Sequence, residues 1–222
     1  MEDTMIEELA KQLRRPDGDF GRQVGERMNE GNRFMNEQAI VALGLQDGMS
    51  VLEIGMGNGW FIRQILAGAR NIRYTGCDYS DTMISEAEIR NQDFVRQGVV
   101  TLHKAEAKQL PFGSNSFDRI LTVNTLYFWE QPIHELTELK RVLKPEGRLI
   151  IAIRPENCMK HLPVTAFGFR LYSTETLLAL LREAGFDIVE STEHLEQSQQ
   201  FGDSEISMAS AVIIAQPHRE AN

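Results

Sequence analysis

The feature that most constrains this chain is an alternation, from about residue 50 onward, of short β-branched runs with segments of helical spacing. Runs 117–123 and 148–153 are apolar at most positions, which is typical of strands buried on both faces. Further predicted strands span 51–55, 72–77, 99–103, 186–189 and 208–215. Alternating strands and helices form βα units, which build a mostly parallel sheet. We therefore predict a doubly wound α/β fold, with a seven-stranded sheet and helices on both faces.

Two stretches lie outside this alternation. Residues 1–48 are helix-prone and are interrupted at Pro16–Gly18, and residues 154–172 form an irregular connection. A chain of 222 residues is long enough for one sizeable core and short for two. We therefore expect a helical cap, residues 1–48, that forms a single compact unit with a ligand-binding domain, residues 49–222. Ligands in open α/β sheets bind at the carboxyl ends of the strands, so both stretches are expected to shape a substrate pocket there.

Charge and composition argue against several function classes. The formal net charge is −9, which disfavours attraction to a nucleic-acid backbone. No apolar run approaches the roughly 20 residues that cross a bilayer, and Met1–Arg15 lacks the apolar core of a signal peptide. Cys77 and Cys158 make no metal-ligand spacing, so no metal site is expected. We expect a cytoplasmic protein, monomeric or homodimeric, without a nucleic-acid partner.

A glycine-rich turn follows the first predicted strand and contains Gly55, Gly57 and Gly59. Glycines at every second position let the backbone approach a ligand without a Cβ in the way. The next helix presents free N–H groups and the positive end of its dipole. We interpret the turn as a ligand site, although a purely structural turn has the same pattern.

A dinucleotide is the rival ligand for such a turn. Its G-x-G-x-x-G fingerprint needs a third glycine for close packing around a pyrophosphate. That position is Trp60 counted from Gly55, or Ile62 counted from Gly57. Glu53, just before the glycines, would oppose a pyrophosphate but suits a ligand that carries an ammonium group. An NAD(P)-dependent oxidoreductase is therefore the less favoured interpretation.

Asp78 ends the second predicted strand, 19 residues beyond Gly59. An acid about 20 residues after such a turn reaches a ribose diol, and its carboxylate can accept two charge-assisted hydrogen bonds. The alternative is that Asp78 only caps the next helix, in competition with Ser80. We favour the ribose role because the acid and the glycine-rich turn occur together.

Together with the residues that leave strands three and four, these elements resemble the class I S-adenosylmethionine (SAM)-dependent methyltransferases. The resemblance is to the broad family that contains ubiquinone- and menaquinone-biosynthesis and related small-molecule methyltransferases, and it covers roughly residues 50–153. It implies the Rossmann-like class I methyltransferase fold. The matching positions are Glu53, Gly55, Gly57, Gly59, Asp78, Tyr79, Ser80, Met83, Glu106, Leu110–Phe112, Phe117–Asp118 and Leu139–Leu149.

The resemblance implies an enzyme of the EC 2.1.1 class that uses SAM, releases S-adenosylhomocysteine and methylates a small-molecule or lipid-like acceptor. Glu53 and the backbone of the turn would hold the amino-acid end of SAM. Asp78 would hold the ribose, and Tyr79 and Met83 would pack near adenine. The enzyme must then hold the acceptor in line with the methyl–sulfur bond.

The same resemblance assigns Glu106 and the Ala107 backbone to the adenine amino group, and Asn124 and Thr125 to the floor beside the methyl donor. Two departures from the family pattern stand out. Glu106 replaces the commoner aspartate, which lengthens the reach by one methylene and preserves acceptance. The segment from Asn124 lacks the Asn/Asp-Pro-Pro-Tyr/Phe signature, which argues against N-methylation of nucleic-acid bases.

A hydroxyl or carbon acceptor loses a proton on methylation, so a general base is a further expectation. Tyr127, beside the tip of strand four, and His161, in the irregular connection, are the candidate catalytic residues. An exposed loop histidine is the competing interpretation of His161, and His134 is expected to be solvated. A protein that binds SAM without turnover, as a regulatory subunit, is the alternative function.

Overall fold

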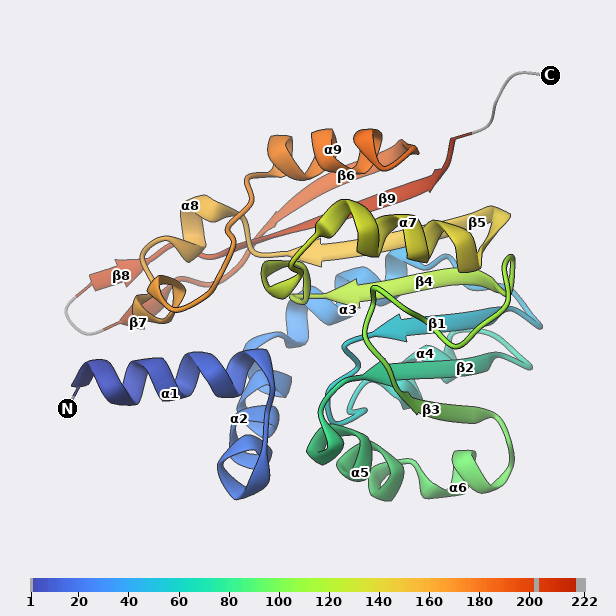
Figure 1. The fold of residues 1–222 in the computed structure, drawn as a ribbon, viewed down its shortest axis with the longest axis horizontal. Helices are drawn as coiled ribbons and strands as arrows, with labels where there is room; N and C mark the ends of the chain where they lie inside the picture. The colour runs from blue at the N-terminus through green and yellow to red at the C-terminus, as the bar shows by residue number, and fades with distance from the viewer. Residues whose placement is uncertain (1, 202–203, 219–222) are drawn as a thin grey trace.

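The computed structural model describes residues 2–201 and 204–218 and contains a seven-stranded sheet (Figure 1). The strand order is β3-β2-β1-β4-β5-β9-β6, and β9 runs antiparallel to both of its neighbours. The predicted doubly wound, mostly parallel sheet is confirmed. Its strands are β1 (Ser50–Ile54), β2 (Arg73–Asp78), β3 (Val100–Lys104), β4 (Phe117–Val123), β5 (Leu143–Ile153), β6 (Phe186–Leu195) and β9 (Ala209–Pro217), and a separate pair is β7 (Gln199–Phe201) with β8 (Ser204–Ile206).

Helices cover both faces of the sheet. In Figure 1, α3 (Arg33–Ala42) and α4 (Ile62–Ala67) lie behind it and α7 (Pro132–Val142) lies in front. The remaining helices are α1 (Glu2–Arg14), α2 (Gly18–Gly31), α5 (Asp81–Arg90), α6 (Gln92–Arg96), α8 (Glu156–Met159) and α9 (Thr174–Glu183), with 3-10 turns η1 (Leu126–Phe128) and η2 (Pro163–Ala166). Within the described ranges, no helix combines the length and the apolar character that a bilayer crossing requires.

Side chains of the central strands point alternately into two separate hydrophobic cores, one on each face of the sheet. In β5, Ile150 and Ala152 join the core that includes residues of α3 and α4. Leu149 and Ile151 join the core on the other face, with residues of α7 and α9. Because successive side chains of a strand point to opposite faces, a strand covered by helices on both faces must be apolar throughout.

The sequence predicts one helix over residues 81–97, after the second strand. The structure interrupts it at Asn91, where α5 ends and α6 begins. Asn91 is fully buried, and its Nδ2 donates to the carbonyls of Gly59 at 3.0 Å and Ala87 at 3.1 Å. A buried amide needs such partners, and these bonds hold the helix break against the end of the glycine-rich turn. Helical spacing does not reveal the break, because Gly59 is 32 residues away in the sequence.

The fifth strand begins earlier than the sequence predicts. Helical spacing predicts a helix to Lys144 and a strand from Arg148, but β5 begins at Leu143 and includes both residues. Leu143 pairs with Phe117 of β4. Lys144 Nζ lies 2.8 Å from Oδ1 of Asp118, which is also in β4. Contacts with the neighbouring strand decide the structure here, and local spacing does not report them.

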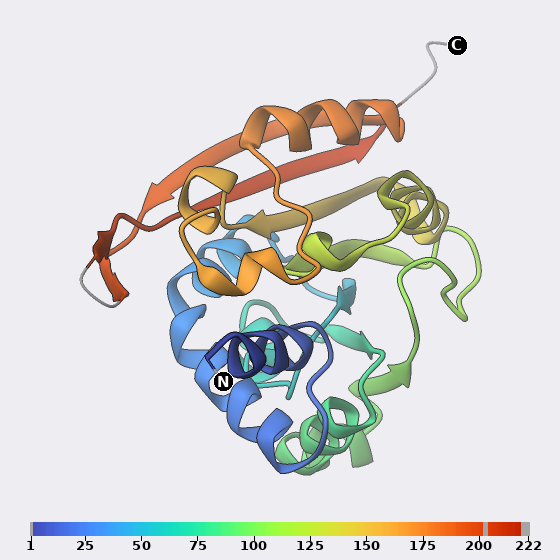
Figure 2. The same ribbon diagram turned by 60° about the vertical axis from the view of Figure 1, so that its left-hand side comes forward.

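The carboxyl ends of β1, β2 and β4 point toward α1 and α2 (Figure 1). Figure 2 shows α1 crossing in front of these strand ends, below the connection that contains α8 and η2. The N-terminal helices and the irregular connection therefore border the same edge of the sheet. In contrast, α3 packs against β4, β5 and β9, so it belongs to the layer that covers the sheet.

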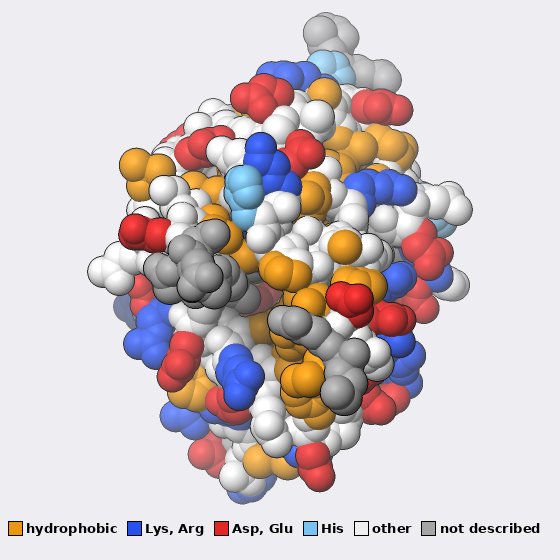
Figure 3. Space-filling view, turned by 90° about the vertical axis from the view of Figure 1, so that its left-hand side faces the viewer, with side chains coloured by type: hydrophobic (Ala, Val, Ile, Leu, Met, Phe, Trp, Pro, Cys, Tyr) orange, Lys and Arg blue, Asp and Glu red, His pale blue; other side chains and the backbone are white. Residues whose placement is uncertain are grey.

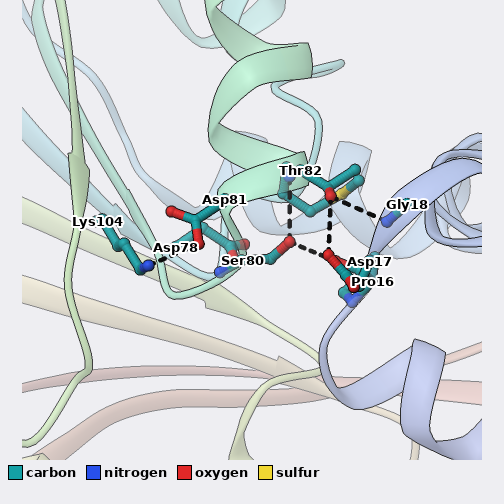
Figure 4. Close-up of polar contacts among 9 residues, drawn as sticks. Pro16, Asp17, Gly18, Asp78, Ser80, Asp81, Thr82 and Lys104 are labelled. Carbon is teal, nitrogen blue, oxygen red and sulfur yellow. Dashed lines mark hydrogen bonds and ion pairs between the residues drawn. The ribbon is translucent and has the colours of Figure 1, made fainter.

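The turn between α1 and α2 is fastened to the start of α5 (Figure 4). Ser80 Oγ donates to the Pro16 carbonyl. Thr82 Oγ1 lies 3.3 Å from Asp17 Oδ1 and accepts the Gly18 N–H at 3.1 Å. The Pro16–Gly18 interruption, visible in the sequence, is thus the segment that holds α1 beside the end of β2.

A core substitution on α7 tests this architecture. Leu139 is fully buried in the core shared by α7 and α9. We expect Leu139→Ala to lower the free energy of unfolding by about 2–5 kcal/mol, because it removes buried apolar surface and leaves a cavity. The exposed neighbour Thr137, replaced by Ala, should change it by less than about 0.5 kcal/mol. Equilibrium denaturation in urea measures both, and equal effects would contradict the assigned helix faces.

Candidate functional site

A cavity of about 210 Å³ lies at the carboxyl ends of the strands. Its walls come from α1, α2, the glycine-rich turn and the residues that follow β2, β3 and β4. Figure 3 views the molecule from this side, where hydrophobic side chains gather near the middle of the face. The structure brings to this cavity the sequence-predicted residues Glu53, Gly55, Gly57, Asp78, Tyr79, Met83, Glu106, Ala107, Asn124 and Thr125.

Gly59 is the predicted cofactor residue that does not line the cavity. Its φ is 68°, and a Cβ there would lie 2.8 Å from Asn91 Nδ2 and 2.9 Å from the Ala87 Cβ. Gly57 has a φ of 57°, and a Cβ there would meet nothing within 4 Å, because the position faces the cavity. Gly59 therefore serves close packing against α5, whereas Gly57 leaves the cavity wall open to a ligand.

Glu53 is a buried carboxylic acid in the wall of the cavity, with 6% of its surface exposed. Burial raises its pKa to about 7, against the lowering effect of the hydrogen bond that Tyr74 Oη donates to Oε2 at 2.5 Å. The neighbouring charge of Asp78 raises the pKa further. Glu53 therefore changes charge near neutral pH, and a cationic ligand group would favour its ionised form.

Asp78 is buried at the end of β2 and holds the glycine-rich turn in place. Its Oδ2 accepts the Gly57 N–H at 3.1 Å, and its Oδ1 accepts the Ser80 N–H at 2.9 Å. Burial raises the pKa of Asp78, and these N–H donors lower it. The cap of α5 is Ser80, whose Oγ accepts the Met83 N–H at 3.1 Å. Asp78 therefore does not serve as the helix cap, and each of its oxygens retains acceptor capacity.

The remaining predicted adenine residues differ in their exposure. Met83 is fully buried, and Tyr79 Oη donates to the Arg14 carbonyl of α1. The Glu106 side chain is 58% exposed and forms an ion pair with Lys108 at 2.6 Å. The carboxylate of Glu106 is therefore already engaged at the surface, although the residue borders the cavity.

A second cavity, of about 320 Å³, adjoins the first. Its lining is mostly apolar, with Met159, Leu162 and Phe169 on one side. Residues that border both cavities come from α1, α2 and the segment after β4: Leu13, Met28, Asn32, Asn124 and Phe128. The two cavities thus share a wall, so ligands bound in them would lie next to each other.

Asn124 lies on this shared wall in the left-handed backbone region, with a φ of 57°. Its Nδ2 donates to Asn32 Oδ1 at 3.1 Å, and its Oδ1 lies 3.0 Å from Tyr127 Oη. Asparagine tolerates this backbone conformation better than most residues, but the conformation is still strained. The hydrogen bonds to Asn32 and Tyr127 stabilise it. The side chain is therefore fixed at the junction of the two cavities.

The structure places the two predicted bases differently: Tyr127 lines the second cavity, whereas His161 lines neither. Tyr127 is 3% exposed, and its hydroxyl accepts the Arg154 N–H at 2.6 Å beside the Asn124 amide. Burial raises the pKa of Tyr127 well above its usual value, so the phenol stays protonated and positions its neighbours. His161 is exposed, in the turn between α8 and η2. His134 is exposed, as expected.

Several site residues escaped the sequence interpretation. Asn29 of α2, Asn32 between the two helices and Asn36 of α3 line the first cavity. Their spacing of three and four residues is the signal that could have revealed them. Arg154 follows β5 directly and lines the second cavity. The sequence signal for Arg154 is its position directly after a parallel strand, where ligands bind in open α/β sheets. Glu135 of α7 lines the first cavity and has no comparable signal, because it follows the exposed His134 in a helix of mixed polarity.

Comparisons with known proteins agree with this geometry. A family model described as a methyltransferase domain matches residues 52–151. The chain is 26% identical over 160 residues to the Bacillus subtilis methyltransferase YdaC, covering 72% of this chain and 83% of that one. It is 31% identical over 154 residues to the O-methyltransferase rstn1 of Aspergillus nomiae, covering 66% and 68%. A demethylmenaquinone methyltransferase of Beutenbergia cavernae is 27% identical, with 75% and 65% covered.

The fold is also that of solved methyltransferase structures. A chain from the complex between the Haloferax volcanii Trm112 methyltransferase activator and a methyltransferase superposes with a TM-score of 0.78 at 18% identity, covering 89% of this chain and 94% of that one. The family match and the relatives exclude the oxidoreductase interpretation. This chain belongs to the class I SAM-dependent methyltransferases, and SAM is its cofactor.

Proposed function

We propose that the methyl acceptor is a small, mostly apolar molecule that binds in the second cavity. The observation that carries this proposal is the wall that the two cavities share at Asn32, Asn124 and Phe128. An acceptor beside that wall lies next to the cofactor cavity, and the apolar lining of the second cavity favours an apolar molecule. The names of the relatives in Aspergillus nomiae and Beutenbergia cavernae, an O-methyltransferase and a demethylmenaquinone methyltransferase, support a small acceptor.

Arg154 is a buried cation in the lining of the second cavity and is a polar group to which an acceptor could bind. The Arg154 side chain is 7% exposed, and its Nη1 lies 3.1 Å from Glu196 Oε2. Its Nη2 donates to the Gly31 carbonyl at 2.7 Å. A guanidinium has five N–H donors, more than these contacts use, so an oxygen of the acceptor can bind there. Oxygen-bearing acceptors are therefore the first to test.

In the cofactor cavity, Glu53 and the Gly57 backbone hold the amino-acid end of SAM, and Asp78 holds the ribose diol. Two buried carboxylates facing one cavity, together with the open position at Gly57, fit a ligand with an ammonium group and vicinal hydroxyls. Tyr79, Met83 and the Ala107 backbone border the adenine, and Thr125 lies beside the methyl donor.

Bound SAM supplies an electrophilic methyl group on a sulfonium, so the chain contributes mainly by positioning the acceptor. Asn124, fixed by Asn32 and Tyr127, orients the acceptor at the junction of the cavities. The helices α1 and α2 act as the cap that limits access of water to the transfer site. No residue is assigned as a base, because an acceptor that is already ionised against Arg154 needs none.

The ribose role of Asp78 is tested by Asp78→Ala. We expect SAM affinity to fall roughly 100-fold, because two charge-assisted hydrogen bonds are lost at about 1.5 kcal/mol each. The control is Asp81→Ala, three residues further along the chain. It removes an exposed carboxylate that is paired with Lys104 (Figure 4) and should leave the SAM affinity within about twofold. Titration calorimetry with SAM measures both variants. Unchanged affinity in Asp78→Ala would refute the cofactor assignment.

The pKa of Glu53 predicts a pH dependence of SAM binding. The ammonium group of SAM favours ionised Glu53, so affinity should fall by up to about tenfold per unit as the pH decreases below about 7. Because the Tyr74 hydrogen bond lowers this pKa, Tyr74→Phe should move the midpoint to higher pH. In Glu53→Gln the dependence should disappear. Calorimetry from pH 5.5 to 7.5, where the amino group of SAM stays mostly protonated, measures the profile, and a flat profile in the unmodified protein would contradict the role of Glu53.

Filling the second cavity should block the acceptor without affecting the cofactor. Val164 and Ala166 both lie on η2, but only Val164 lines the cavity. We expect Val164→Trp to raise the acceptor KM at least tenfold while SAM affinity stays unchanged, and Ala166→Trp to change neither. The assay follows labelled methyl transfer to the best acceptor from a panel of apolar phenols and carboxylic acids. Equal activity in the two variants would place the acceptor elsewhere.

A further inference from the structure

The two cavities differ in the charge of the side chains that line them. Most of the charged residues that line the cofactor cavity are acids: Glu53, Asp78, Glu106, Glu130 and Glu135, against the cations Arg14 and Lys108. Both cations are paired with acids of the same lining, Lys108 with Glu106 at 2.6 Å and Arg14 with Glu130 at 3.5 Å. The cofactor cavity therefore has an excess of acidic side chains, which suits a cationic ligand.

The second cavity has the opposite character. Among the described residues, its lining includes Arg27 of α2 and Arg154, directly after β5, and no Asp or Glu. The formal net charge of the chain is −9, so a lining in which the charged groups are cations departs from the average of the protein. A cavity with apolar walls and charges of one sign raises the local concentration of ions of the opposite sign. The second cavity therefore favours an anionic ligand.

Arg27 is the cation of this lining that is available to a ligand. Arg154 is 7% exposed, and its Nη1 lies 3.1 Å from Glu196 Oε2. Arg27 is exposed, and in the part of the chain that the structure describes it has no ion pair or side-chain hydrogen bond. Val24 and Gly31, three residues before it and four after it, line the same cavity, so Arg27 lies on the helix face that borders the cavity.

A carboxylate is the anionic group that fits these observations. A guanidinium binds a carboxylate through two parallel N–H···O hydrogen bonds. A free carboxylic acid is ionised at neutral pH, whereas a phenol, with a pKa of about 10, is mostly neutral. Removing a carboxylate from water costs more free energy than removing a neutral amide, so an apolar cavity prefers the carboxylate only where a cation lies nearby.

Resting on the proposed place of the acceptor, we propose that the second cavity selects an apolar carboxylate and that Arg27 binds its carboxylate group. The apolar body of such a molecule packs against the side of the cavity formed by Met159, Leu162 and Phe169. Arg27 is then a specificity-determining residue, which distinguishes an anionic acceptor from a neutral one of the same shape.

The experiment compares naphthoate with naphthamide, which share one ring system and differ in carrying a carboxylate or a neutral amide. Each competes with the neutral fluorescent reporter phenylnaphthylamine, while S-adenosylhomocysteine saturates the cofactor cavity. The ratio of the two inhibition constants is measured at neutral pH for the unmodified protein, Arg27→Gln and Arg22→Gln. Arg22 is the matched control, because it is an exposed arginine of α2 that pairs with Asp19 and lines neither cavity.

We expect the unmodified protein to prefer naphthoate, and Arg27→Gln to reduce this preference by about threefold or more, because an ion pair at an exposed arginine is lost. Arg22→Gln removes the same charge away from the cavity and should retain the preference. Equal affinity of the unmodified protein for the two compounds, or an equal loss of preference in the two variants, would overturn this inference.

Val164→Trp separates this result from the proposed function. It fills the second cavity, so it should weaken the binding of the reporter and of both competitors. If it does so while the unmodified protein binds naphthoate and naphthamide equally well, the acceptor site stands and the selection of a carboxylate fails. Unchanged reporter binding in Val164→Trp would refute the acceptor site itself, and the role of Arg27 with it.

Discussion

The site depends on the hydrogen bonds that Asp78 accepts from the Gly57 and Ser80 N–H groups. One carboxylate thereby joins the turn after β1 to the segment after β2. Burial disfavours the ionised form of Asp78, and the backbone N–H donors favour it. Because these donors come from the two segments, a single side chain fixes the position of one segment relative to the other. Through Ser80, which caps α5 and donates to Pro16, the same group of contacts extends to the N-terminal helices.

The fold, and most of the residues that line the first cavity, could be predicted from the sequence because their signals are local. Strands buried on both faces are continuous apolar runs, and the glycine-rich turn and its acid occur at fixed offsets. What could not be predicted depends on partners far away in the chain. The helix break at Asn91 goes with the hydrogen bond that its side chain donates to the Gly59 carbonyl. Leu143 belongs to a strand because it pairs with Phe117 of the neighbouring strand.

Side-chain direction was a second limit. The sequence places Tyr127 beside the tip of strand four and His161 in the irregular connection, but it does not report that the Tyr127 hydroxyl lies in a buried hydrogen-bond network or that the His161 imidazole is exposed. Glu135 shows the opposite error, since no sequence pattern distinguishes it from the solvated residues of its helix. In the structure Glu135 is buried and lines the first cavity.

The common wall of the two cavities has a thermodynamic consequence. Leu13 of α1, Met28 of α2 and Asn32, between α2 and α3, border both spaces. Under the proposed function, an occupant of one space therefore restricts side chains that the other occupant must also meet. The second ligand then encounters a surface whose ordering cost is already met, which is cooperativity without a change of fold. Linkage makes the effect reciprocal: whatever factor the donor adds to acceptor affinity, the acceptor adds to donor affinity.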